Sequence, residues 1–69
     1  MMPRPSILYV KVSREGKTLD ARILTNSNDP TFDVQALELA KRLQWNPAKK
    51  NGEPVEAWVQ WLCRPERQQ

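Results

Sequence analysis

The sequence predicts an α+β domain in which a β-hairpin is followed by a helix and then by a third strand. Three observations predict this order. Two strand-like stretches flank Gly16, an amphipathic stretch begins at Asp29-Pro30, and a further strand-like stretch follows Asn51-Gly52. These elements combine into a three-stranded antiparallel sheet with the helix on one face, because each must bury its apolar side against another.

The first two strands are predicted over residues 7–13 and 18–25, where apolar and β-branched residues alternate with polar ones. A turn joins them, since Gly16 takes a positive φ angle without steric cost. On the first strand, Ile7, Tyr9 and Lys11 lie on one side and Leu8, Val10 and Val12 on the other. The apolar face of the second consists of Leu19, Ala21 and Ile23. The two strands are therefore expected to form a hairpin.

The helix is expected to start at Asp29-Pro30. The Asp29 side chain can accept hydrogen bonds from the first helical turn, and proline suits the first helical position. Apolar residues then recur at helical spacing: Phe32, Ala36, Leu37, Ala40 and Leu43. The helix should end near residues 44–46, because Pro47 disfavours helical geometry in the residue before it. Trp45 is expected to close the bottom of the core.

The third strand is predicted over residues 55–63, after a turn built around Asn51-Gly52. One of its faces carries Ala57, Val59, Trp61 and Cys63, and the other carries Glu56, Trp58, Gln60 and Leu62. Because Trp58 and Trp61 lie on opposite faces, at least one of them must be exposed. Either tryptophan can be the one that packs under the helix, and the pattern favours neither strongly.

An all-antiparallel sheet places the first strand in the centre, in the order 2-1-3. The third strand then forms an open edge, where another chain can add a strand. Pro54 and Glu56 could blunt the start of this edge, but they leave the rest available. The candidate partner-binding residues are Glu56, Ala57, Trp58, Val59, Gln60, Trp61 and Leu62.

The length of 69 residues indicates a single domain. Residues 1–6 are expected to form a flexible lead-in, residues 7–63 the domain, and residues 64–69 a polar tail. A chain of this size buries only roughly 60% of its unfolded surface. Self-association is therefore an open possibility, because a second copy would add burial.

The composition argues against catalytic and metal chemistry. The chain has no histidine and one cysteine, Cys63, so a Cys/His metal site and an internal disulfide are not expected. Helix capping and the helix dipole explain Asp29 and Asp33 without a paired-carboxylate site. The sequence therefore predicts no enzyme, no cofactor and no metal.

The net charge of +3 comes from 11 basic and 8 acidic residues without a basic stripe. Nucleic acid is therefore not the expected partner, although tryptophan stacking leaves a small single-stranded nucleic-acid-binding domain as an alternative. No apolar run approaches the ~20 residues of a membrane span. The first residues also lack the apolar core of a signal peptide, so the chain shows no targeting signal.

The order and spacing of several motifs resemble the C-terminal domain of TonB-type energy transducers over about residues 7–62. The matching positions are Gly16, Asp29-Pro30, Phe32-Asp33, Trp45, Pro47-Ala48, Gly52 and Pro54-Val55. The membrane anchor, the proline-rich spacer and the helix that accompany this domain in the family are not seen. MMPRPS stands where that helix and a Tyr-Pro segment would precede the first strand.

The resemblance implies a partner-binding domain at the periplasmic face of the cell envelope, although a cytoplasmic location stays open. A peptide from the plug region of an outer-membrane transporter would add as a strand along residues 56–62 and support energised uptake. A structural homodimer formed through the same edge is the alternative from a different class.

Overall fold

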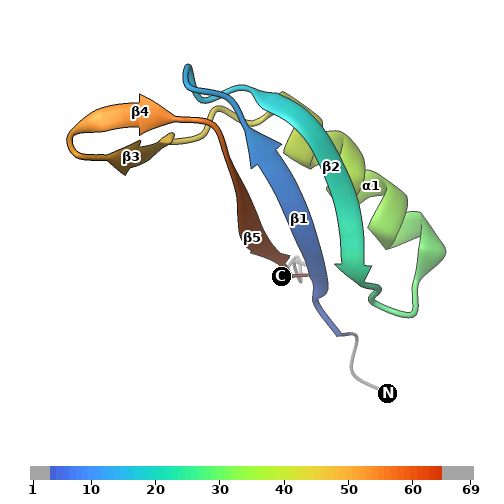
Figure 1. Cartoon of the computed structure of the whole chain (residues 1–69). Helices are drawn as coiled ribbons and strands as arrows, with labels where there is room; N and C mark the ends of the chain where they lie inside the picture. The colour runs from blue at the N-terminus through green and yellow to red at the C-terminus, as the bar shows by residue number, and fades with distance from the viewer. Residues whose placement is uncertain (1–3, 65–69) are drawn as a thin grey trace.

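The computed structural model describes residues 4–64, so residues 1–3 of the predicted lead-in and residues 65–69 of the predicted tail lie outside the described residues. The elements are β1 Ser6–Val12, β2 Thr18–Thr25, α1 Pro30–Arg42, β3 Ala48–Lys50, β4 Glu53–Val55 and β5 Ala57–Cys63. An antiparallel sheet in the order β2-β1-β5 carries the helix on one face (Figure 1). The predicted order, with the first strand central, is confirmed.

The core lies between the central strand and the helix. The inward residues of β1 are at most 1% exposed: Leu8, Val10 and Val12. From the helix, Ala36 and Ala40 are equally buried. Partly buried apolar residues surround this centre, namely Ala21, Ile23, Phe32, Leu37, Trp45, Val59 and Trp61. Of the two sides of the first strand, the one with Leu8, Val10 and Val12 faces the core. The predicted helix stripe is confirmed for Phe32, Ala36, Leu37 and Ala40, whereas Leu43 lies beyond the end of the helix. Trp45 packs against the core as predicted.

The pairing of β2 with β1 is irregular at two places. Leu19 has no partner in the register, because Lys11 lies opposite Asp20 and Val12 opposite Thr18. Leu24 is skipped in the same way near the other end of the strand. Both leucines are 54% exposed. An extra residue in one strand bends it and interrupts the alternation of its side chains. The predicted place of Leu19 on the apolar face is therefore wrong.

The helix begins as predicted and ends slightly earlier. Asp29 is the N-cap and accepts a hydrogen bond from the Phe32 N–H at 3.3 Å, with Pro30 in the first turn. Leu43 already has an extended backbone. The chain leaves the helix there because the next residues bond to the β1–β2 turn. Gln44 Nε2 donates to the Glu15 carbonyl at 3.0 Å, and the Trp45 N–H donates to the Gly16 carbonyl at 2.8 Å.

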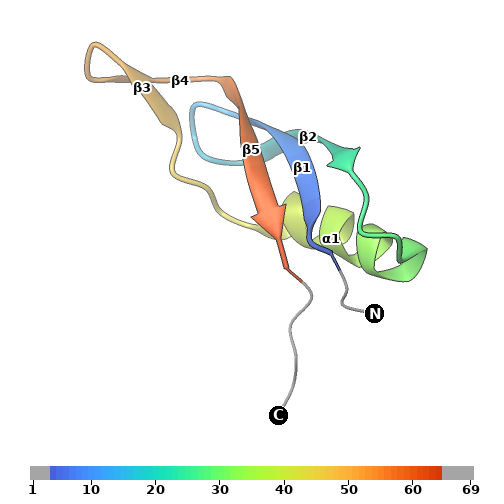
Figure 2. The same cartoon turned by 90° about the horizontal axis from the view of Figure 1, so that it is seen from below.

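The region after the helix holds a second hairpin that the sequence did not predict. Strands β3 and β4 pair across a turn in which Asn51 and Gly52 both have positive φ angles, as a tight hairpin turn requires. This hairpin projects from the end of the main sheet (Figure 2). Val55 belongs to β4, so the predicted third strand starts two residues later than expected, at Ala57. Three-residue strands are too short to show alternation in a sequence.

Candidate partner-binding edge

Strand β5 is paired along its whole length on one side only. Its seven residues face β1 in an unbroken register, from Ala57 opposite Val12 to Cys63 opposite Ser6. Within residues 4–64 no strand pairs with its other side. An edge strand of this kind presents unpaired N–H and C=O groups from alternate residues. The six predicted site residues from Ala57 to Leu62 therefore lie together on an open edge.

One set of alternate side chains on β5 faces the helix. Val59 and Trp61 are half-buried and pack against the core. The Trp61 ring meets Trp45 edge-on, with centroids 5.5 Å apart and an interplanar angle of 87°. Such edge-to-face pairs are a preferred aromatic geometry. Trp61 is thus the tryptophan that packs under the helix layer, which resolves the alternative that the sequence left open.

The other set lies on the open face of the sheet. Trp58 is 40% exposed, and its ring centroid lies 5.6 Å from that of Tyr9. The Arg22 guanidinium lies 5.8 Å from the Trp58 centroid, within the range of a cation–π contact. Gln60 and Leu62 are exposed on the same strand. The prediction that at least one tryptophan is exposed is confirmed.

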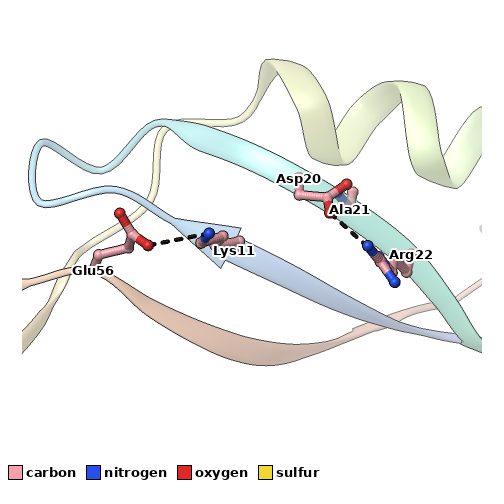
Figure 3. A network of polar contacts seen from close by, with 5 residues as sticks. All are labelled: Lys11, Asp20, Ala21, Arg22 and Glu56. Atoms are coloured by element: carbon pink, nitrogen blue, oxygen red, sulfur yellow. Dashed lines mark hydrogen bonds and ion pairs between the residues drawn. The ribbon is translucent and has the colours of Figure 1, made fainter.

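Glu56 lies outside β5, in the break between β4 and β5. Its carboxylate accepts from Lys11 Nζ at 3.2 Å, a contact drawn in Figure 3 together with the Asp20–Arg22 pair on β2. Both partners of the Glu56–Lys11 pair are partly exposed, so the pair contributes at most about 1 kcal/mol to stability. Its geometric effect is to join the bend before β5 to the central strand.

The two edges of the sheet differ in regularity. The β2 edge contains the irregularities at Leu19 and Leu24, which bend a strand and disturb its ladder. The β5 edge has none over residues 57–63. A regular edge is the better template for an added strand. Of the two edges, β5 is therefore the one suited to pairing with another chain.

The polar residues elsewhere have structural roles. The Asp33 carboxylate accepts from Ser6 Oγ and from the Ser27 N–H, the latter at 3.1 Å. Burial raises the pKa of Asp33, but these hydrogen bonds and the nearby Arg4 outweigh it and bring the pKa below its ordinary value. Burial also raises the pKa of the Cys63 thiol, which lowers its reactivity. Over residues 4–64 no group of acidic, cysteine or histidine side chains is arranged to hold a metal ion.

Sequence reasoning located the edge but missed the residues beside it on the open face. Tyr9 and Arg22 border Trp58, and Lys11 holds Glu56. The alternation of the first strand does place Tyr9 and Lys11 on its outer side. Their contacts depend on the register between strands, which the sequence alone does not give.

The fold and the edge define a small α+β domain whose distinctive feature is a regular strand with one unpaired edge. The family model described as Gram-negative bacterial TonB protein C-terminal matches residues 5–62. The chain therefore belongs to the TonB C-terminal family, as the resemblance indicated. Neither the curated proteins nor the solved structures gave a match.

Domains of this family are periplasmic parts of Gram-negative envelope proteins, take part in energy transduction and interact with outer-membrane transporters. They act as transducing and binding domains rather than as enzymes. In the part of the chain that the structure describes, no helix has the length and apolar character needed to cross a membrane.

Proposed function

We propose that this chain binds an extended segment of an outer-membrane transporter as a fourth strand along β5, and that this contact supports energised uptake across the outer membrane. The observation that carries the proposal is the unbroken register of Ala57–Cys63 with β1, which leaves one regular edge free. Strand addition to a free edge is a recurring mode of peptide recognition.

Main-chain hydrogen bonds would supply much of the affinity. Alternate residues of β5 direct their N–H and C=O groups outward, so an added segment can form several bonds without any particular sequence. Each contributes about 0.5–1.5 kcal/mol net. At a rise of about 3.3 Å per residue, seven residues span roughly 23 Å. A segment of about that length fills the edge.

Side chains of the added segment would set the preference. On the helix side they would lie beside Val59 and Trp61, and on the open side beside Trp58 and Leu62. Cross-strand neighbours of aromatic and β-branched type stabilise such pairs. A segment with apolar residues in alternation therefore fits the edge better than a uniformly polar one.

Amide-shift NMR titration with peptides from transporter N-termini tests the proposal. We expect the largest shifts over residues 56–62. Two variants sharpen the test: Val59→Pro and Gln60→Pro. Neighbouring N–H groups on a strand point to opposite sides, so one of the two prolines removes a hydrogen bond to β1 and should destabilise the fold. The other removes only an N–H group that points outward to the free edge. The variant that stays folded should lose peptide binding. Shifts confined to β2 or to the open face would contradict strand addition.

The same edge favours one second candidate, a homodimer joined through β5. Two copies can pair these strands antiparallel, because the pairing is then identical for both partners. Only six apolar residues are buried over residues 4–64. A second copy would add buried surface to this small core, which also favours a dimer. Sedimentation at several concentrations separates the two uses. A strict monomer at high concentration removes the dimer, whereas a dimer that the peptide dissociates shows that both compete for β5.

A further inference from the structure

Strand β3 limits the free edge of β5 at one end. Ala48 lies opposite Val55, and both views show β3 on the other side of β5 from β1 (Figures 1 and 2). This is the side on which an added strand would run along β5. Such a strand would therefore meet β3 within about two residues of Ala57, so β3 fixes where the segment ends.

Two exposed lysines lie at this point. Lys49 and Lys50 form the outer part of β3, and over residues 4–64 neither makes an ion pair. Glu53 lies across the hairpin from Lys50, whereas the partner of Lys49 is the uncharged Pro54. The acid that directly precedes β5, Glu56, is bound to Lys11. With two lysines and one nearby glutamate on the hairpin, the end of the edge beside β3 therefore carries a net positive charge.

The lysines are close enough to act on an added strand. Pro54, opposite Lys49, precedes Ala57 by three residues, which is about 10 Å of strand. Lysine and carboxylate side chains together bridge much of that distance. The Debye length is about 10 Å at 0.1 M salt, so attraction persists even without direct contact. A carboxylate at that end of the segment would be stabilised, whereas one at the far end would not.

We propose that the segment bound along β5 carries acidic residues at the end that meets β3, and that Lys49 and Lys50 select for them. The inference rests on the proposed function and adds the chemistry of the partner to it. It also links the position of the acidic residues in the segment to the direction in which the segment runs. A parallel strand places its N-terminal end beside β3, and an antiparallel strand its C-terminal end.

Three end-blocked peptides test the inference. All share a seven-residue core of alternating threonine and valine. One carries Asp-Asp before the core, one carries Asp-Asp after it, and one carries Asn-Asn in place of Asp-Asp. Affinity for the full chain is measured by amide-shift titration at about 0.02 M and at 0.5 M salt. The test variant is Lys49→Gln with Lys50→Gln, and the matched control is Arg14→Gln with Lys17→Gln. The control removes the same charge from the β1–β2 turn.

We expect one of the two acidic peptides to bind about two- to ten-fold more tightly than the other two peptides at low salt. The preference should vanish at high salt and in Lys49→Gln with Lys50→Gln, and persist in the control variant. Equal affinity for both acidic peptides, or a preference that survives in the test variant, overturns the inference. If the β5 amides shift equally with all three peptides, only this inference fails. If none of the three peptides shifts the β5 amides, both this inference and the proposed function fail.

Discussion

The indole Nε1 of Trp45 donates a hydrogen bond to Thr18 Oγ1 at 2.8 Å, and the same hydroxyl donates to the Ala40 carbonyl at 2.6 Å. One threonine thus connects the segment after the helix, the start of β2 and the last turn of α1. This contact holds the Trp45 ring where Trp61 packs against it edge-on. The helix packs mainly on β1 and β2, so the Trp45 ring supports the inner side of β5.

The first prediction concerns this hydroxyl. Thr18→Val keeps the shape of the side chain and removes both hydrogen bonds. We expect a loss of about 1–3 kcal/mol in the free energy of unfolding, measured by urea denaturation, because two part-buried groups lose partners. Thr18→Ser retains the hydroxyl and should lose less. The double variant with Trp45→Phe should cost less than the sum of the single changes. Additive losses would show that the Trp45–Thr18 contact contributes nothing.

The two glycines give a matched pair for a second prediction. Gly16 and Gly52 have similar φ angles, +88° and +82°. A Cβ on Gly16 would clash with the Trp45 carbonyl oxygen, whereas a Cβ on Gly52 meets nothing within 4 Å. Gly52→Ala should therefore cost only the conformational penalty of about 1–2 kcal/mol. Gly16→Ala should cost clearly more, because the Gly16–Trp45 hydrogen bond must also shift. Equal losses in thermal or urea unfolding would contradict this reading.

Asp33 gives a third prediction, on the dependence of stability on pH. Its pKa is lowered in the folded state from its ordinary value of 3.8, because the hydrogen bonds from Ser6 and Ser27 and the charge of Arg4 outweigh the effect of burial. The unfolded chain binds the proton more readily, so protonation favours unfolding. The contribution of Asp33 is complete above its ordinary pKa and is lost as the pH falls through the lowered value.

Asp33→Asn should therefore reduce the fall in stability at acid pH, in urea unfolding followed from neutral pH downward. The matched control is Asp29→Asn, because asparagine caps a helix about as well as aspartate. The profile of Asp29→Asn, followed in the same way, shows how much of any change comes from removing a negative charge at the start of the helix. An unchanged profile in Asp33→Asn would show that another carboxyl group dominates.

Local signals made the main elements predictable. The N-cap at Asp29 and the helical stripe of Phe32, Ala36, Leu37 and Ala40 depend on residues close together in the sequence, and the structure confirms them. The central place of β1 followed from strand directions alone. The displacement of Leu19 was not predictable in this way. It depends on how the β1–β2 turn sets the register, and Ser13 fixes that turn by accepting from the N–H groups of Glu15 and Lys17.

The sequence predicted that the candidate site is a strand edge, but it did not predict which side chains surround that edge. The alternation of Trp58 and Trp61 required one exposed ring, but only the position of Trp45 decides which one is buried. The β3–β4 hairpin was missed because the Asn-Gly signal predicts a turn and gives no information on strands as short as three residues. The limit that β3 sets on the edge follows from tertiary arrangement alone.

The two tryptophans of β5 give the last prediction. Trp61→Ala removes a half-buried ring from the core and from its contact with Trp45, and should cost about 3 kcal/mol or more of unfolding free energy. Trp58→Ala removes a ring that is 40% exposed and should cost less, although its contacts with Tyr9 and Arg22 are lost. Trp58→Ala should instead weaken peptide binding in the amide-shift titration, because the open-face side chains of an added strand would lie beside this ring. If Trp58→Ala is the more destabilising change, the open face contributes more to folding than the core side of β5.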